Sequence, residues 1–341
     1  MQRCLDLASM ALGNVAPNPM VGAVLVYEDR IIGEGFHQKF GEAHAEKNAI
    51  ESVLPKDRHL VPLAMLYVSL EPCAHFGKTP PCSDLILLHE IKKVVIGTID
   101  PFIEVAGRGM EKLKNAGVEI VFPVLEKECQ VLNKRFFTFH QKKRPYIILK
   151  WAQTANGLIS SSDPADSRWI SNSLSQKLVH KWRTEEQAIL VGTNTARVDN
   201  PRLTVRSWEG NHPLRVVLDK NLHLPKTLHI FDGTTSTLVY TSQSKRSSTN
   251  LTYEILDFDA NILATISESL YNKNIQSLIV EGGAMVLQSF IKANLWDEAR
   301  VFTSPCVFKK GLYAPVFQGR LTGSTMLLSD TLQIYNNTTA Q

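Results

Sequence analysis

The first half of the chain carries His44-Ala45-Glu46, followed by Cys73 and Cys82. Histidine and cysteine are ligands that zinc prefers, and a catalytic zinc takes three protein ligands and leaves a fourth position open for water. The metal makes that water acidic enough to attack an amidine-like ring carbon at neutral pH. Glu46 is too close to His44 to be a comfortable ligand, but it is well placed to carry protons to the leaving amine. The pattern predicts a zinc-dependent deaminase with His44, Cys73 and Cys82 as ligands and Glu46 as the catalytic acid and base.

The spacing of the two cysteines departs from the general pattern of zinc deaminases, which is His-x-Glu followed by Pro-Cys-x-x-Cys. Here Pro72 precedes Cys73, but the second cysteine comes only after the segment from Ala74 through Pro81. The order and the residue types match the pattern, whereas an insertion has opened the cysteine pair.

Two other interpretations of the cysteines stay open at this point. Free cysteine commonly serves as a small buried apolar residue, which suits the three cysteines outside this motif better than it suits the pair within it. A structural zinc site would need a fourth protein ligand, for which His75 is the candidate. The catalytic interpretation is preferred because Glu46 has no purpose in a closed structural site.

Length and composition limit the possible classes of protein. A chain of 341 residues is longer than an average domain, so two domains are expected. Its 44% hydrophobic and 21% charged residues are ordinary for a globular protein. An odd number of cysteines, together with the lack of an apolar stretch of membrane-spanning length and of a signal-peptide pattern, favours a cytoplasmic protein without a membrane partner.

The distribution of charge speaks against nucleic acid as a partner. The formal net charge is +4, but residues 1–144 hold 18 basic and 17 acidic side chains, and the rest of the chain holds 19 and 16. Neither half is the basic domain that polynucleotide binding requires. We therefore expect a small-molecule substrate, and we expect the chain to form a homo-oligomer.

Strand-like and helical patterns alternate along the chain, which predicts α/β units with largely parallel sheets covered on both faces. Ser83 is the expected cap of one helix and His44 opens another. The metal ligands would then lie at the starts of neighbouring helices, where the dipole favours thiolate over thiol. In the first half, the predicted helices span residues 4–12, 44–54, 83–90 and 107–115, and the predicted strands span residues 21–27, 31–35, 66–70, 94–99 and 118–122.

A basic segment from His140 to Arg144 is interpreted as a solvated linker between two domains, residues 1–140 and 145–341. The alternation of patterns then starts again. In the second half, the predicted strands span residues 146–151, 188–192, 214–219, 238–241 and 277–281, and the predicted helices span residues 175–184, 266–270 and 284–293.

Three polar loops follow strands of the second half. The turn at Gly282-Gly283 exposes backbone N–H groups at a helix start, which is a ready site for a phosphate. The segment 191–195 repeats this pattern, and the segment 199–206 ends in Arg206, whose planar guanidinium can clamp a phosphate. Each loop alone would fit a polar surface, but together they indicate a nucleotide or sugar-phosphate pocket.

Over nearly its whole length the chain resembles the bifunctional deaminase/reductase family of riboflavin biosynthesis. The motifs of the first half that carry this resemblance are Asn18-Pro19-Met20-Val21-Gly22, His44-Ala45-Glu46, Glu71-Pro72-Cys73, Gly77-Lys78-Thr79-Pro80-Pro81-Cys82 and Val105-Ala106-Gly107-Arg108-Gly109. Those of the second half are Ser167-Arg168-Trp169-Ile170, Asp199-Asn200-Pro201, Leu203-Thr204-Val205-Arg206 and Val280-Glu281-Gly282-Gly283. The long gap between the two cysteines is characteristic of this family.

The resemblance implies a cytidine-deaminase-like three-layer α/β/α domain followed by a dihydrofolate-reductase-like α/β domain. It implies hydrolytic deamination of 2,5-diamino-6-(5-phosphoribosylamino)pyrimidin-4-one at zinc. Reduction of the ribosyl group by NADPH would then give 5-amino-6-(5-phosphoribitylamino)uracil. By matching motif positions, the implied cofactor contacts are Gln153, Trp169, Thr195, Asp199 and Gly283, and the implied substrate contacts are Ser167, Arg183, Leu203, Arg206 and Glu281.

Two positions depart from the family pattern. Asn156 stands where the family usually has an aspartate, and an amide cannot relay a proton as a carboxylate can. Phe102 replaces the usual asparagine after Asp100-Pro101 in the deaminase half.

Two rival classes of function remain. One is a nucleoside or RNA deaminase with a non-catalytic binding domain, which predicts a basic second half studded with aromatic residues. The other is an inactive interaction protein in which His75 is the fourth ligand of a structural zinc ion. Oxidation of NADPH on turnover distinguishes both from a deaminase/reductase.

Overall fold

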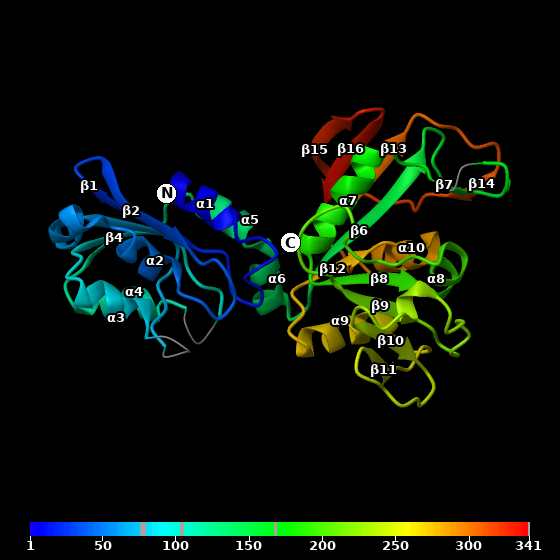
Figure 1. Cartoon of the computed structure of the whole chain (residues 1–341), viewed down its shortest axis with the longest axis horizontal. Helices are drawn as coiled ribbons and strands as arrows, with labels where there is room; N and C mark the ends of the chain where they lie inside the picture. Colours follow the sequence, from blue (N-terminus) through cyan, green and yellow to red (C-terminus); the bar gives the residue numbers. More distant parts are fainter. Residues whose placement is uncertain (76–79, 103–105, 167–168, 340–341) are drawn as a thin grey trace. The chain divides into compact units, whose positions relative to one another are not determined.

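The computed structural model describes residues 1–75, 80–102, 106–166 and 169–339. The chain divides into two units, residues 1–143 and 144–341, and each has its own β-sheet (Figure 1). Within the described ranges, no helix combines the length and the apolar character needed to cross a bilayer.

Unit 1, residues 1–143, is built on a five-stranded sheet in the order β2-β1-β3-β4-β5. Strands β3, β4 and β5 are parallel, but β1 is antiparallel to both of its neighbours. The expectation of a largely parallel sheet is wrong for β1 and β2, because a tight turn at Glu28 and Asp29 joins them instead of a helix. The strands are β1 (Gly22–Tyr27), β2 (Arg30–Phe36), β3 (Met65–Leu70), β4 (Lys93–Thr98) and β5 (Glu119–Val121).

Helices cover both faces of this sheet and give it three layers. On one face, Ala49 of α2, Ile86 of α3 and Leu113 of α4 join the buried core with Leu66 and Ile96 of the strands. On the other face, α1 packs against β1. The helices of unit 1 are α1 (Gln2–Ser9), α2 (Ala45–Glu51), the 3-10 helix η1 (Pro55–Leu63), α3 (Cys82–Leu88), α4 (Arg108–Asn115), α5 (Glu126–Leu132) and α6 (Lys134–Lys142).

The expectation that Ser83 caps a helix is wrong. Helix α3 begins one residue earlier, at Cys82, and its N-cap is Pro81. Ser83 is fully buried, and within the described part of the chain its hydroxyl has no hydrogen-bond partner. The shift matters for the site because it places the Cys82 side chain itself in the first turn of α3.

The segment from His140 to Arg144 is not a solvated linker. Helix α6 continues to Lys142, and the His140 ring packs against Phe136 with 4.3 Å between the ring centroids. Arg144 is buried and its guanidinium donates to Asp297 at 2.8 Å. The segment therefore consists of the end of α6, its C-cap at Lys143 and the first residue of unit 2, Arg144.

Unit 2, residues 144–341, contains a nine-stranded sheet in the order β11-β10-β9-β8-β12-β6-β13-β16-β15 and a two-stranded sheet of β14 and β7. The seven strands from β11 to β13 are parallel, and β16 and β15 add antiparallel pairs at one edge. The strands are β6 (Tyr146–Thr154), β7 (Leu158–Ser161), β8 (Ala188–Gly192), β9 (Leu214–Leu218), β10 (Thr237–Thr241), β11 (Leu251–Ile255), β12 (Ser277–Val280), β13 (Glu298–Ser304), β14 (Gly311–Tyr313), β15 (Arg320–Leu327) and β16 (Asp330–Asn336).

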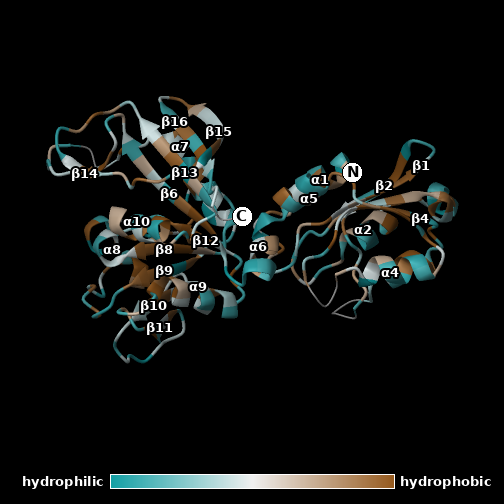
Figure 2. Ribbon diagram, turned by 180° about the vertical axis from the view of Figure 1, so that it is seen from behind, coloured by the Kyte–Doolittle hydropathy of each residue, from teal (hydrophilic) through white to brown (hydrophobic). Residues whose placement is uncertain are grey.

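Two buried clusters cover the faces of the large sheet. Helices α9 and α10 pack on one face through residues such as Ile266 and Phe290, and α7 and α8 pack on the other through residues such as Trp182 and Ala196. The strands of both units are largely apolar, whereas many helices carry polar stretches (Figure 2). The helices of unit 2 are α7 (Ser173–Glu185), α8 (Thr193–Asp199), the 3-10 helix η2 (His229–Phe231), α9 (Ile262–Asn272) and α10 (Ala284–Lys292).

The parallel strands of unit 2 end at one edge of the sheet, where ligands of α/β sheets generally bind. The turn after β12 and the segment after β8 lie at this edge. One of the three predicted loops is partly wrong, because Thr193 to Asp199 forms helix α8 instead of a loop. The backbone N–H groups of the first turn of α8 therefore join those of α10 at the edge where an anion would bind.

Candidate functional site

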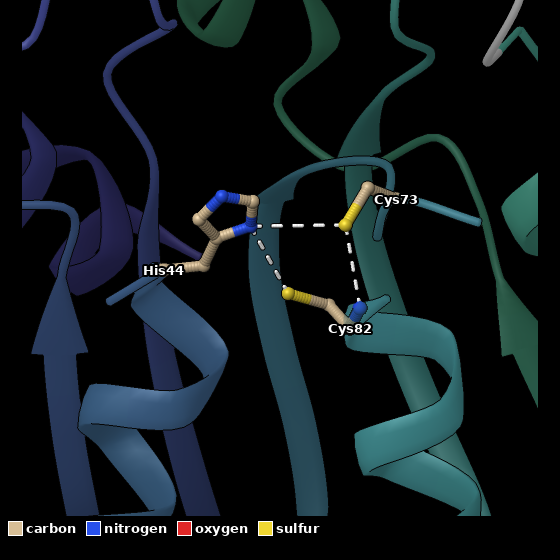
Figure 3. A group of neighbouring side chains, drawn as sticks. All are labelled: His44, Cys73 and Cys82. Atoms are coloured by element: carbon tan, nitrogen blue, oxygen red, sulfur yellow. Dashed lines mark hydrogen bonds between the residues drawn. The ribbon is translucent and has the colours of Figure 1, made fainter. Parts of the chain in front are cut away.

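Three zinc-type ligands converge in unit 1 (Figure 3). His44 is the N-cap of α2, Cys82 opens α3, and Cys73 lies in the loop that follows β3. Their ligand atoms all lie within 4.8 Å of one another, and among the described residues this is the one such group of His, Cys, Asp or Glu. The neighbouring starts of α2 and α3 bring together residues that are 38 positions apart in the chain.

The spacing of these atoms fits a tetrahedral zinc ion. His44 Nδ1 lies 3.3 Å from Cys82 Sγ and 3.7 Å from Cys73 Sγ. With Zn–N near 2.0 Å and Zn–S near 2.3 Å, two such ligands of a tetrahedral zinc stand about 3.5 Å apart. His75 is exposed and does not belong to the group, so the described residues supply three ligands and leave a fourth position for water.

The two thiols share their protons unequally. The hydrogen bond from Cys82, together with His44 and the backbone N–H of Cys82, lowers the pKa of Cys73 to about 4. The same hydrogen bond and burial raise the pKa of Cys82. The expectation that a helix start favours thiolate is therefore wrong for Cys82, which opens α3, in the metal-free protein. The thiolate is favoured instead at Cys73, in the loop before α3, through hydrogen bonds. Binding of zinc would displace the remaining proton.

Glu46 lies in the first turn of α2, two residues from the ligand that caps the helix. It is only 3% exposed, and burial followed by the negative charge of Cys73 raises the pKa of its carboxyl. A buried carboxyl beside the ligands, in a position to exchange protons with a bound water, is the equipment of a general acid and base.

Glu71 is a residue of the site to which the sequence assigned no role. Its carboxylate accepts the backbone N–H groups of Gly107 at 2.9 Å, Gly109 at 2.9 Å and Met110 at 3.1 Å, at the start of α4. A side chain at Gly109 would meet the carbonyl oxygen of Pro72 at 1.9 Å. Glu71 and the glycines of α4 therefore pin the loop that carries Cys73, which gives a physical reason for two of the motifs.

His37 is a second residue that the sequence did not reveal. It is buried, its Nδ1 pairs with the carbonyl oxygen of Ala43 at 3.0 Å, and its Nε2 pairs with the side-chain amide of Asn18 at 3.1 Å. Its ring lies edge-on to that of His44 with 5.5 Å between centroids. These contacts orient His44, but a lone histidine after a strand carried no signal that could have shown it.

The departure at Phe102 has a packing explanation. The Phe102 ring lies 5.1 Å from that of His140 on α6. Burial and the charge of Lys143 lower the pKa of His140 to about 4, so that this ring stays neutral and suits an apolar neighbour.

In unit 2, three buried charged side chains meet on one face of the large sheet. Arg183 of α7 donates to Glu281 Oε2 at 2.9 Å, and Lys150 Nζ of β6 lies 3.9 Å from Glu281 Oε1. Burial opposes ionisation, but Arg183 and Lys150 together lower the pKa of Glu281. Within the described residues, Glu281 Oε1 and Arg183 Nε are buried without a hydrogen-bond partner. Such unsatisfied atoms indicate a place where a polar ligand supplies the missing hydrogen bonds.

The sequence predicts a strand over residues 146–151 but assigns no role to Lys150 within it. A charged residue in a buried parallel strand needs a partner, and this rule is the signal that could have revealed it. Its neighbours on the same face are Glu281 and the ring of Phe302, whose centroid lies 5.9 Å from Nζ.

The implied substrate contacts are only partly brought together. Arg183 also donates to the carbonyl oxygen of Thr204 at 3.2 Å, which ties the loop of Leu203 and Arg206 to α7. Leu203 is buried with a left-handed backbone, and the Arg206 residue is exposed. Ser167 lies outside the described residues.

The turn after β12 fits the phosphates of a dinucleotide. Gly283 is the N-cap of α10 with a positive φ of 64°, and no described side chain caps the helix. A side chain at Gly283 would meet Thr195 Oγ1 at 3.1 Å, so that two implied cofactor contacts flank one narrow space. Uncapped N–H groups and a position that admits glycine alone are the features that an anion needs for close approach.

The other implied cofactor contacts lie near the end of β6, in the loop before α7 and at the end of α8. Gln153 near the end of β6 accepts from Trp151 at 2.9 Å. Trp169 is 68% exposed, and Asp199 ends α8 at the surface.

Asn156 is held by the loop that it faces. Its side-chain amide donates to the carbonyl oxygen of Phe308 at 2.8 Å, and its Oδ1 accepts from Thr154 Oγ1 at 2.7 Å. A carboxylate could not donate to Phe308, so this chain uses the position to fasten a loop.

Two family models match the chain. The cytidine and deoxycytidylate deaminase zinc-binding region matches residues 1–98, and the RibD C-terminal domain matches residues 145–330. Among curated relatives, the riboflavin biosynthesis protein RibD of Aquifex aeolicus is 40% identical and covers 92% of this chain and 88% of its own length. That of Synechocystis is 37% identical, with 94% and 87% covered.

Solved structures show the same likeness over both units. The crystal structure of a diaminohydroxyphosphoribosylaminopyrimidine deaminase/5-amino-6-(5-phosphoribosylamino)uracil reductase from Thermotoga maritima has a TM-score of 0.89 and 39% identity, covering 98% of this chain and 97% of that chain. A structure of Acinetobacter baumannii RibD has a TM-score of 0.88 and 30% identity, with the same coverage.

Proposed function

Since the chain belongs to the RibD family of bifunctional deaminase/reductases of riboflavin biosynthesis, we propose that each of its two units carries out one of two consecutive reactions. The expected fold classes are confirmed: unit 1 is cytidine-deaminase-like and unit 2 is the dihydrofolate-reductase-like RibD domain. The domains that we assign are residues 1–140 for deamination and 145–341 for reduction.

In the first reaction, unit 1 removes the ring amine of 2,5-diamino-6-(5-phosphoribosylamino)pyrimidin-4-one as ammonia. His44, Cys73 and Cys82 would hold the zinc ion, which would supply an acidified water when bound. Glu46, a buried carboxyl with a raised pKa, would take up the proton of the attacking water and pass it to the departing amine. Glu71 and His37 keep the ligands in position through the contacts described above.

In the second reaction, unit 2 reduces the ribosyl group to a ribityl chain, which takes up a hydride that NADPH would supply and a proton. The turn at Gly283 and Thr195 binds the cofactor phosphates, with Gln153, Trp169 and Asp199 as further contacts. Arg206 binds the phosphate of the substrate, and Ser167, Arg183, Leu203 and Glu281 complete its pocket. Arg183 and, from the neighbouring strand, Lys150 hold Glu281 in its ionised form.

The observation that carries this proposal is the convergence of His44, Cys73 and Cys82 beside the buried carboxyl of Glu46. The test is to supply the diamino substrate and NADPH to the purified protein and to follow ammonia release and NADPH oxidation together. Both signals are expected, in equal amounts and with ammonia first. A protein that binds zinc but releases no ammonia would contradict the deaminase assignment.

We also propose that the enzyme works in the cytoplasm on a small molecule as a homo-oligomer, without nucleic acid. The even division of charge between the two halves supports the absence of nucleic acid. Sedimentation of the purified protein tests the oligomeric state, and a monomer at micromolar concentration would contradict it.

A further inference from the structure

The loop that carries Arg206 is held by two histidine rings. The backbone N–H of Arg206 donates to His180 Nδ1 at 3.2 Å, and the backbone N–H of Val205 donates to His212 Nδ1 at 3.2 Å. Two consecutive amides that have no strand partner are thus satisfied by imidazole nitrogens. Because an imidazole nitrogen accepts only while it carries no proton, both rings must present an unprotonated Nδ1.

The surroundings of His180 favour the neutral ring, whose unprotonated nitrogen can accept a hydrogen bond. It is 7% exposed on α7, three residues before Arg183, and it faces the guanidinium groups of Arg183 and Arg206 and the carboxylate of Glu281. Burial and the two arginines lower its pKa to about 4, against the weaker opposite effects of Glu281 and of a hydrogen bond to the Thr204 backbone. The ring is therefore neutral at physiological pH, with its single proton on Nε2.

The Arg206 side chain has few contacts of its own, so its direction depends on how its backbone is held. It is exposed, and its one described hydrogen bond is a 3.4 Å contact between Nη1 and Thr204 Oγ1. Arg183 grips the same loop at the carbonyl oxygen of Thr204. Helix α7 therefore holds the loop at two successive points, a carbonyl through Arg183 and an amide through His180, and this fixes the direction in which Arg206 leaves the backbone.

We propose that His180 is a positioning residue of the reductase, which aims Arg206 at the phosphate of the substrate, with His212 as a second support of the same loop. The inference rests on the proposed function of Arg206 as the phosphate-binding residue. His180 makes no contact with the reacting atoms in this account, and its effect passes wholly through Arg206.

The test compares two substitutions at one position. His180→Leu removes the acceptor, and His180→Asn restores an acceptor oxygen near the place of Nδ1. Loss of one hydrogen bond predicts a rise in the KM for the deaminated substrate of roughly three- to tenfold in His180→Leu, with kcat and NADPH affinity within about twofold of wild type. His180→Asn should return the KM to within about twofold. Equal rises in both variants, or a change in NADPH affinity of the same size, would show a merely structural role.

A double substitution shows whether the effect passes through Arg206. In an Arg206→Ala background, His180→Leu should raise the KM by less than about twofold, because the residue to be positioned is gone. Full additivity of the two effects would overturn the proposal. His223→Gln is the matched control, since this exposed histidine lies after β9 and outside the loop. If His180→Leu does not fold, His212→Leu takes its place, because His212 is exposed and supports the same loop.

The pH profile is a further readout. A folded pKa below the ordinary value of 6.5 means that the hold of His180 is complete above that pH and is lost as the pH falls toward about 4. The ratio of the wild-type KM to that of His180→Asn should therefore stay constant between about pH 7.5 and 5.5, although the substrate phosphate itself titrates near pH 6. A ratio that rises as the pH falls through 6.5 would show a ring that titrates as an ordinary histidine, and would contradict the proposal. If the wild type oxidises no NADPH at all, the proposed function fails instead.

Discussion

The two units of this chain assemble their sites in different ways. In unit 1, three side chains whose chemistry suits zinc meet within 4.8 Å at the starts of two helices. In unit 2, the proposed site spreads along the carboxyl edge of a parallel sheet. It includes a backbone turn at Gly283 and the buried charged side chains of Glu281, Arg183 and Lys150. A metal site depends on a few irreplaceable atoms, whereas a cofactor and phosphate site distributes its binding over many groups.

This difference predicts different responses to substitution. Removal of one metal ligand or of the proton carrier should abolish deamination, while loss of one contact in unit 2 should weaken reduction by a limited factor. Because the sites belong to separate units, each substitution should leave the other reaction intact.

The largest effect is expected from Cys82→Ala. Loss of one thiolate from three ligands should reduce the zinc content from about one ion per chain to near zero and deamination to background. Reduction of the deaminated substrate should continue at the wild-type rate. Metal analysis and the two assays check this, with Cys306→Ser as the control cysteine of unit 2. Full zinc retention in Cys82→Ala would remove Cys82 from the ligand set.

The next effect is that of Glu46→Gln, which keeps the shape of the side chain and removes its ability to carry a proton. Zinc should stay bound, and deamination should fall by roughly a hundred- to ten-thousandfold. Ammonia release in a stopped assay gives the rate, and metal analysis gives the occupancy. Deamination within a few fold of wild type would show that another group moves the proton.

A smaller effect is expected from Arg206→Ala in unit 2. Loss of a charge-assisted contact costs about 1.5–3 kcal/mol, which is roughly ten- to a hundredfold in the KM for the deaminated substrate. NADPH affinity and deamination should stay nearly unchanged. Steady-state NADPH oxidation measures the KM. The control is Arg320→Ala, which removes one positive charge at the start of β15, outside the proposed site. Equal kinetics in Arg206→Ala and wild type would place the phosphate elsewhere.

The smallest effect concerns Asn156→Asp, which installs the residue usual in the family. The carboxylate loses the donor to the Phe308 carbonyl oxygen and places a negative charge against it. We expect unit 2 to lose about 1–2 kcal/mol of stability, or roughly 2–8 °C in its melting temperature. Calorimetry of wild type and variant decides this. An unchanged or higher melting temperature would mean that the amide does not fasten the loop.

The sequence predicted unit 1 well because its signals are local and chemically specific. A histidine, a glutamate two residues later and two proline-flanked cysteines have few alternative meanings. The prediction that Ser83 caps a helix was wrong because Pro81 is the N-cap and α3 begins at Cys82. The sequence indicates a turn at Glu28 and Asp29, but the expectation of a largely parallel sheet overlooked that so short a turn makes β1 and β2 antiparallel.

Unit 2 was less predictable because its determinants are contacts between distant residues. Strand β13 was not found, since it includes Glu298 and Arg300, a buried pair joined at 2.6 Å that breaks the apolar pattern of a central strand. The resemblance supplied the roles of Arg183 and Glu281, but only the structure shows Lys150 beside them. The histidine supports of Arg206 are likewise set by tertiary contacts, and no spacing in the sequence indicates them.

The central claim is that two separate sites on one chain carry out consecutive reactions, and a chelated enzyme tests it most directly. The zinc is removed, and NADPH oxidation is measured with the diamino substrate and with its deaminated product. We predict that the metal-free protein oxidises NADPH with the deaminated product at the wild-type rate, and with the diamino substrate only after zinc is restored. Oxidation with the diamino substrate in the absence of zinc, or none with the deaminated product, would contradict the account.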